Sequence, residues 1–185
     1  MLPERLESAD GLLLRRWVAS DAETLARAVA ENTNHLRPWM PWVAEEPLPL
    51  ERRREMIDQW EREWLQGGDV VMGVFRDGRV AGGCGMHHWI GAGGLEIGYW
   101  IHCAFLRLGI ATAAVRLLTD AALASPGITH VEIHHDKANE ASAGVPRKLG
   151  YELVAQVQGE VEAPAEVGIS CHWRLTRENW KPPTR

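Results

Sequence analysis

The chain has 185 residues, of which 45% are hydrophobic and 24% are charged, and its formal net charge is −5. This length suits one domain with a substantial core, and the acidic balance argues against a broad nucleic-acid-binding surface. Three cysteines without a Cys-x-x-Cys pair argue against a disulfide framework or a zinc ribbon, and no apolar run reaches the length of a membrane span. We therefore expect a single cytoplasmic domain over residues 1–185 that binds neither nucleic acid nor membrane.

Helical and strand patterns alternate along the chain. Apolar residues three or four apart indicate helices, and apolar residues two apart indicate strands. In chain order the patterns predict a strand at 11–18, a helix that follows a cap at 20 and runs to about 31, and an irregular segment rich in Pro and Trp at 32–42. A helix at 49–66, a hairpin of strands at 70–75 and 79–85, a strand at 95–101 and a helix at 109–123 come next. The last predicted elements are a strand at 130–134, a helix at 139–149, and strands near 152–159 and 169–175. Strands mixed with crossover helices imply an α/β fold with a mixed sheet.

The first helix has a start signal in the sequence. Ser20 and Glu23 are three residues apart, which is the spacing of a capping box. In that motif the serine hydroxyl accepts a hydrogen bond from the amide three residues on, while the glutamate reaches back to the serine amide. We therefore expect this pair to begin the helix.

The most informative segment is the turn between the strand at 95–101 and the helix at 109–123. The amides of a first helical turn have no internal partner and lie at the positive end of the helix dipole, so they suit a pyrophosphate. Gly109 lets a ligand approach the backbone, Ala111 and Thr112 are small, and Arg107 can add a charge-assisted bond. On these physical grounds alone, an ordinary strand-to-helix connection stays open beside a phosphate site.

Three stretches resemble motifs of the GNAT superfamily of N-acetyltransferases, in its RimJ/RimL-type branch. They are Leu95-Glu96-Ile97-Gly98-Tyr99-Trp100-Ile101 with Gly109-Ile110-Ala111-Thr112, then Asn139-Glu140-Ala141-Ser142 with Lys148-Leu149-Gly150-Tyr151-Glu152, and upstream His35-Leu36-Arg37-Pro38-Trp39-Met40-Pro41-Trp42. The resemblance covers roughly residues 11–180 and implies a GNAT-like fold with splayed central strands. It also implies transfer of an acyl group from acetyl-CoA, or another acyl-CoA, to a primary amine of a protein N-terminus or a small molecule.

The resemblance further implies a set of cofactor-binding residues. Backbone groups of one central strand would pair with the pantetheine arm, amides of the next turn would hold the pyrophosphate, and a later helix would contact the far arm or the sulfur end. The residues at these positions are Trp100, Ile101, His102, Arg107, Leu108, Gly109, Ile110, Ala111, Thr112, Asn139 and Ser142. Two positions depart from the family pattern. Leu106 stands where Gln or Arg is usual, and Pro146 has no amide for the Ser142 carbonyl, which then needs another partner such as water or ligand.

Acyl transfer to an amine needs an acceptor for the amine proton and a donor for the leaving thiolate. Glu96 lies on the strand where several GNAT enzymes place a general base, and its alternative is a structural carboxylate. Ser142 is the candidate donor to the leaving sulfur, and its alternative is a helix cap. His134 and His135 come at the end of the short strand and just after it, and we expect one of them to face the cofactor cleft, although packing or surface roles are favoured for both.

We predict no metal site, because His87 and His88 point to opposite faces if both lie on a strand. The acceptor is expected between the early helices and the late strands. Our candidates for its wall are His35, Trp39, Trp42 and Trp89. Two other functions stay open, a catalytically silent acyl-CoA-binding regulatory module and a nucleotide-phosphate binder, although no Gly-x-x-x-x-Gly-Lys-Ser/Thr motif supports the latter. A homodimer is possible, since dimers are the commonest assembly.

Overall fold

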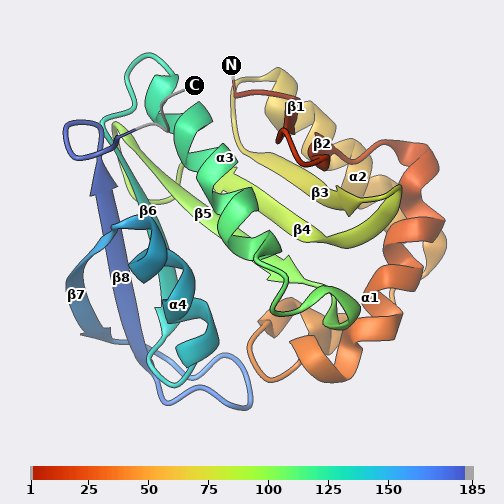
Figure 1. Ribbon diagram of the computed structural model, residues 1–185. Coiled ribbons are helices and arrows are strands. Elements are labelled where there is room, and N and C mark those ends of the chain that lie inside the picture. Colours follow the sequence, from red (N-terminus) through yellow and green to blue (C-terminus); the bar gives the residue numbers. More distant parts are fainter. Residues whose placement is uncertain (1, 182–185) are drawn as a thin grey trace.

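The computed structural model describes residues 2–181, and it contains a mixed β-sheet with helices on both faces (Figure 1). The strands are β1 (Arg5–Glu7), β2 (Leu12–Arg16), β3 (Val70–Arg76), β4 (Arg79–His87), β5 (Gly94–Ile101), β6 (His130–Asp136), β7 (Glu152–Gln158) and β8 (Ile169–Thr176). The helices are α1 (Ala22–Leu36), α2 (Leu50–Leu65), α3 (Ile110–Ala124) and α4 (Glu140–Leu149), with short 3-10 segments η1 (Ala19–Asp21), η2 (Pro41–Glu45) and η3 (Cys103–Phe105). The predicted α/β class with a mixed sheet is confirmed.

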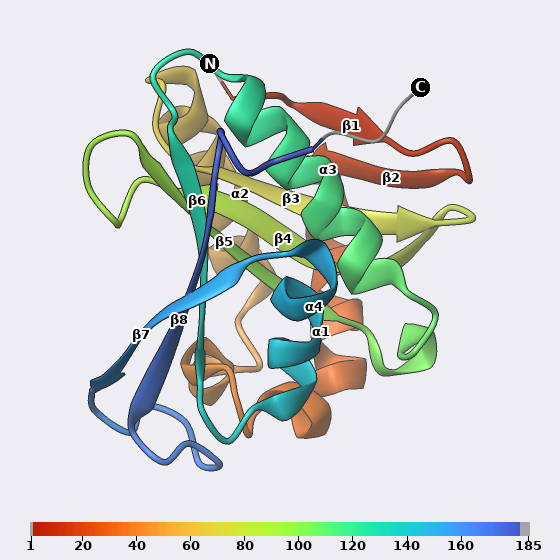
Figure 2. The same ribbon diagram turned by 60° about the vertical axis from the view of Figure 1, so that its left-hand side comes forward.

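The centre of the sheet opens between β5 and β6. The strand order is β1-β2-β3-β4-β5-β6-β8-β7, and only the β5–β6 pair is parallel among the described strands. This parallel pairing covers residues 94–96 and 130–132 and then stops. Beyond it, β5 follows β4 to Ile101 and β6 follows β8 to Asp136, so the two strands diverge (Figure 2). The predicted splayed central strands are therefore confirmed.

Side-chain alternation along β5 assigns its residues to two cores. Leu95, Ile97 and Ile101 are buried in the cluster that contains the inner faces of α3 and α4. Trp100 packs instead against the second cluster, which α1 and α2 complete. Each fully buried aliphatic side chain stabilises the fold by about 1.5–3 kcal/mol. Glu96 and Gly98 share the α1/α2 face with Trp100, because they lie at positions two residues apart.

The start and end of α1 differ from the prediction. The capping box at Ser20 and Glu23 is wrong, because the helix begins at Ala22 without a side-chain cap. The carboxylate of Asp21 instead accepts from the Val18 amide and pairs with Arg15 on β2, at 3.0 and 2.6 Å. A contact with a neighbouring strand thus replaces the local motif. The helix also continues to Leu36, five residues past the predicted end, since its apolar face stays buried to that point.

Candidate active site

The turn after β5 is held in place by α1. The buried side chain of His102 accepts at Nδ1 from the Ala104 amide, and its Nε2 lies 3.1 Å from a carboxylate oxygen of Glu31. Asn32, which is also buried, accepts from the Cys103 amide at 2.6 Å. Two successive residues of α1 therefore fix the path by which the chain enters α3.

The amides that follow this turn face no acceptor in the protein. Among residues 2–181, no hydrogen-bond acceptor lies against the backbone N–H groups of residues 107–112, and the first bonded amide is that of Ala113. Arg107 and Gly109 both have positive φ, at 62° and 78°, and a Cβ built at Gly109 would meet no atom of the described residues within 4 Å beyond its chain neighbours. A left-handed residue beside a helix start is the arrangement that gathers backbone donors around an anion. The predicted pyrophosphate residues thus form one row of open donors.

The free edge of β5 lies beside these donors. The His102 amide donates to the Ala81 carbonyl of β4 and its carbonyl accepts from the Phe105 amide. Because successive residues of a strand turn their backbone groups to opposite edges, Tyr99 and Ile101 face the side from which β6 has diverged. The backbone pairing predicted for residues 100–102 therefore fits Ile101, while the amide of His102 is not free for it and Trp100 is turned toward β4.

The start of α4 is tied to β5 by one side chain that sequence reasoning did not select. Asn139 caps the helix by accepting from the Ser142 amide at 3.1 Å. The Tyr99 hydroxyl lies 3.1 Å from both the carbonyl and the hydroxyl oxygen of Ser142. Pro146 leaves that carbonyl without its helical donor, and Tyr99 supplies the missing bond. The predicted need for another partner is correct, although the partner is a tyrosine of β5 rather than water or ligand.

A charged cluster occupies the α1/α2 face where β5 leaves β6. Glu96 Oε2 lies 3.2 Å from His134 Nδ1, and His134 Nε2 lies 2.6 Å from Glu132 Oε2. Arg174 of β8 donates to Glu132 Oε1 at 2.6 Å. The ring of His172, also from β8, stacks on His134 with 3.8 Å between centroids. We call these five residues the acceptor-face cluster.

The cluster sets the charge of its members. Burial alone would lower the pKa of His134, but its hydrogen bonds to Glu96 and Glu132 outweigh burial and raise that pKa. Burial likewise favours protonated Glu132, yet bonds to His134 and Arg174 hold the pKa of that carboxyl below its usual range. Burial and the neighbouring His134 lower the pKa of His172. Of the two stacked rings, His134 is therefore the one that takes up an added proton more readily.

Glu132, His134 and His172 place one potential metal-ligand atom each within 4.8 Å of one another. Their geometry does not fit an ion, however. The two imidazole planes are nearly parallel at 15°, so their in-plane lone pairs do not converge. Glu132 already accepts a hydrogen bond from Arg174. His87 and His88, for which opposite faces were predicted, both turn their Nδ1 atoms to Asp69, at 2.8 and 3.2 Å. The strand ends at His87, and alternation no longer applies to the next residue.

The predicted acceptor wall divides into two groups. Trp89 stacks on His87 with 4.0 Å between centroids, and a Cβ built at Gly98 would lie 3.9 Å from His87 Nε2. This group therefore borders Glu96 on the same face. His35 lies in the last turn of α1, and Trp39 and Trp42 lie in the connection to α2. That connection meets the β7–β8 loop through a bond from the Ala165 amide to the Pro38 carbonyl at 3.0 Å.

His135 has a packing role, in keeping with the reading favoured for it. Its Nδ1 donates to the Asp136 carbonyl and its Nε2 accepts from the Trp173 indole, both at 2.8 Å. Only its neighbour His134 belongs to the acceptor-face cluster. Asp136 accepts from four amides, of which two are in the β7–β8 loop and one is at the first residue of β8. It thereby fixes the loop that reaches Pro38.

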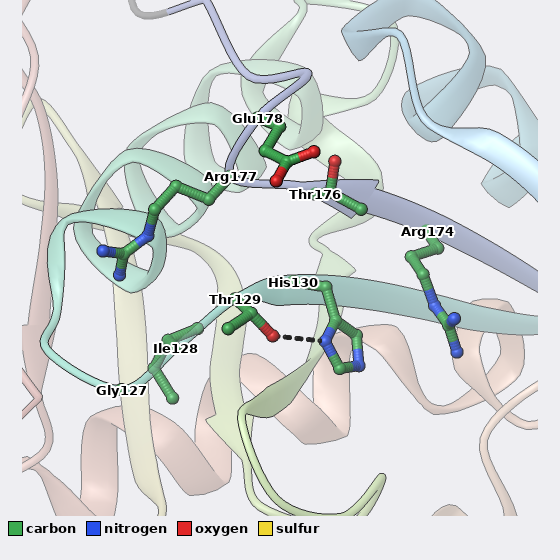
Figure 3. Close-up of a pocket in the computed structure, with 8 residues that line it drawn as sticks. All are labelled: Gly127, Ile128, Thr129, His130, Arg174, Thr176, Arg177 and Glu178. Atoms are coloured by element: carbon green, nitrogen blue, oxygen red, sulfur yellow. Dashed lines mark hydrogen bonds between the residues drawn. The ribbon is translucent and has the colours of Figure 1, made fainter.

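A shallow hollow lies at the other, paired end of β5 and β6 (Figure 3). Its lining residues are Gly127, Ile128, Thr129, His130, Arg174, Thr176, Arg177 and Glu178. The Thr129 hydroxyl and His130 Nδ1 bond each other at 3.0 Å, and Arg177 donates to the Ser125 carbonyl at 2.6 Å. These groups already have partners, and the hollow is on the side of the pairing away from the open amides. We therefore place the active site at the divergence.

Comparison with known proteins identifies the family. Residues 11–152 match the acetyltransferase (GNAT) domain. The chain belongs to this family. "Putative ribosomal N-acetyltransferase YdaF" of Bacillus subtilis (strain 168) is 32% identical to this GNAT chain over 142 residues, which are 76% of the chain and 77% of the relative. The prediction of a GNAT N-acetyltransferase related to the RimJ/RimL branch is thus confirmed, and a silent binding module is not favoured.

Solved GNAT structures share the whole architecture. A crystal structure of a probable acetyltransferase has a TM-score of 0.87 at 26% identity and covers 95% of this chain and 98% of its own. RimL, a ribosomal L7/L12 alpha-N-protein acetyltransferase in complex with coenzyme A, has a TM-score of 0.85 at 19% identity and covers 94% and 98%. At that identity the second match supports the fold alone. No described helix is long and apolar enough to cross a membrane.

Sequence reasoning did not assemble the acceptor-face cluster or select Tyr99. A weak signal was present, because polar residues alternate with apolar ones at His130, Glu132 and His134 in β6, and again at His172 and Arg174 in β8. Two strands with polar alternate positions can share one wet face of a sheet. Their pairing in register, with His134 opposite His172, is information that only the fold provides.

Proposed function

We propose that this GNAT enzyme transfers the acetyl group of acetyl-CoA to the α-amino group of a protein N-terminus. The observation that carries the proposal is the row of open amides at residues 107–112, placed beside the free edge of β5. A diphosphate bound at the amides would leave a pantetheine arm along that edge, which leads toward Ser142 and Glu96. The name of the Bacillus relative favours an N-terminal amine of a ribosomal protein as the acceptor.

Glu96 fits the role of general base. An α-amino group has a pKa of about 7.7–8.0, so most of it is protonated at neutral pH and must lose a proton before it attacks. Oε2 of Glu96 is held by His134, while Oε1 has no hydrogen-bond partner among residues 2–181. A carboxylate fixed through one oxygen presents the other in a defined direction. Ser142, at the start of α4, fits the role of donor to the leaving sulfur.

Calorimetric titration with acetyl-CoA tests the cofactor half of the proposal. Gly109→Trp should lose at least a hundredfold in affinity, because its indole would fill the space in front of the open amides. Gly127→Trp is a matched control just beyond the other end of α3, since Gly127 also has positive φ and a Cβ built there would meet no described residue within 4 Å beyond its chain neighbours. Equal affinity of the two variants would contradict the site.

A transfer assay tests the acceptor half of the proposal. Acetyl transfer from acetyl-CoA should be measured with peptides that carry ribosomal-protein N-termini, the same peptides with a blocked N-terminus, and small amines. We expect turnover with the free peptides and none with the blocked ones. Turnover restricted to the small amines would retain the acetyltransferase and overturn the protein acceptor.

A further inference from the structure

Tyr99 contacts the residue proposed as donor to the leaving sulfur, so its role rests on the proposed function of Ser142. All three polar groups of Ser142 are held by the protein. Its amide donates to Asn139, and its carbonyl and hydroxyl oxygens both lie 3.1 Å from the Tyr99 hydroxyl. Asn139 fixes the residue from within its own helix, whereas Tyr99 holds it from the sheet, at the edge of β5 that faces the opening.

Pro146 determines which way the hydrogens of this contact point. In an uninterrupted helix the Ser142 carbonyl would accept from the amide of residue 146, but proline has no such hydrogen. A buried carbonyl without a donor is costly, so the single hydrogen of the Tyr99 hydroxyl is drawn to it. Burial raises the pKa of Tyr99 to about 12, which keeps that hydrogen in place. The Tyr99 oxygen is then left as an acceptor for the Ser142 hydroxyl.

We propose that Tyr99 is a positioning residue that holds the Ser142 hydroxyl ready for the departing sulfur. The amine that Glu96 has deprotonated forms the C–N bond and becomes cationic at nitrogen. As the C–S bond breaks, the sulfur takes the Ser142 hydroxyl proton, and the Ser142 oxygen regains a proton from that nitrogen. The Tyr99 hydroxyl stays protonated throughout and keeps its hydrogen on the Ser142 carbonyl, so the serine stays in position while its hydroxyl proton is in transit.

The chain offers a matched control in its other tyrosine. Tyr151 is buried, and its hydroxyl lies 2.6 Å from the Thr119 hydroxyl, within the core beneath α3. Tyr99 is partly buried, and Tyr99→Phe and Tyr151→Phe each remove one phenol hydroxyl that is bonded to another hydroxyl. Both should lower the melting temperature, but only the first should change catalysis.

The experiment measures kcat, KM and melting temperature with acetyl-CoA and a peptide acceptor. We expect Tyr99→Phe to lower kcat about tenfold with little change in KM, and Ser142→Ala to lower it about a hundredfold. The double variant should resemble Ser142→Ala, because a residue that acts only through another adds nothing once that residue is gone. Tyr151→Phe should keep kcat within twofold of the wild type.

A second double variant separates the carbonyl contact from the hydroxyl contact. In Tyr99→Phe with Pro146→Ala, the new amide can satisfy the Ser142 carbonyl, so the melting temperature should recover while kcat stays low. Recovery of kcat together with stability would show that Tyr99 only satisfies the carbonyl, and would overturn the inference. So would wild-type kcat in Tyr99→Phe, or multiplication of the Tyr99 and Ser142 effects. Absence of acetyl-CoA turnover by the wild-type chain would instead overturn the proposed function, and the inference with it.

Discussion

The two halves of the candidate site differ in which parts of the chain supply their polar groups. The cofactor half uses consecutive backbone amides at residues 107–112 and the start of α4. The acceptor half uses side chains from β5, β6 and β8, which are separated by up to 78 residues between Glu96 and Arg174. Backbone groups tolerate many side chains, whereas the cluster depends on each residue. Substitutions should therefore affect the two halves independently.

Glu96→Gln should give the largest difference between an effect on the acceptor half and an effect on the cofactor half. Loss of a general base typically costs 10²–10⁴-fold, so kcat should fall by at least about a hundredfold. The amides at residues 107–112 are untouched, and the affinity for acetyl-CoA measured by calorimetry should stay within about twofold. A variant that loses affinity and keeps kcat would show that Glu96 belongs to the cofactor half.

Asp136→Ala should act on the acceptor half through structure. Its carboxylate accepts from amides of Ala138, Val167, Gly168 and Ile169, and these bonds outweigh burial to keep its pKa below the usual range. Hydrogen bonds to a charged group contribute about 1.5–3 kcal/mol, and we expect a loss of about 2 kcal/mol in urea unfolding at pH 7.

The same Asp136 bonds predict an acid sensitivity. A carboxyl whose folded pKa is depressed stabilises the fold above its unfolded pKa and loses that contribution as the pH falls through the folded value. The difference between wild type and Asp136→Ala should shrink below about pH 4. A difference that does not change with pH would contradict the ionised cap.

His134→Gln should show the opposite pH dependence, with an effect of about 1 kcal/mol. His134 has a raised pKa in the fold, above its usual 6.5. Its contribution is fully present below the unfolded pKa of 6.5 and disappears as the pH rises through the folded value. Urea unfolding of both proteins at pH 6 and pH 9 checks this, and a larger difference at pH 9 would be inconsistent with a cationic His134.

The smallest effects concern two left-handed residues. Arg107 has φ of 62° and Asp77 has φ of 50°, and glycine relieves such strain by about 1 kcal/mol. Both Arg107→Gly and Asp77→Gly should raise the free energy of unfolding by that amount relative to the wild type. Only Arg107→Gly should bind acetyl-CoA less tightly, by about three- to tenfold, because it loses a cation beside the pyrophosphate. Equal binding by both variants would remove Arg107 from the cofactor half.

The same contrast explains what the sequence could predict. The order of the elements and the open turn at Gly109 follow from local patterns and a contiguous motif, and they were found. The capping box at Ser20 failed because Asp21 pairs with Arg15 on β2, a contact that no local pattern encodes. The sequence predicts Glu96 only as an isolated carboxylate. Its connection to Arg174 through His134 and Glu132 depends on the register of three strands. Tyr99 was not selected, because its contact with Ser142 joins two elements that are 43 residues apart in the chain.

The position of β8 between β6 and β7 affects the order in which the protein folds. Among the described strands, β7 pairs only with β8, although β7 comes first in the chain. During synthesis, β7 must therefore wait beside an incomplete sheet until β8 has been made and has closed against β6. His172 and Arg174 arrive with β8, so the open amides at residues 107–112 can be complete while the acceptor face is still missing. Under the proposed function, such a chain would bind acetyl-CoA before it is able to use it, and the bound ligand would stabilise the part already folded.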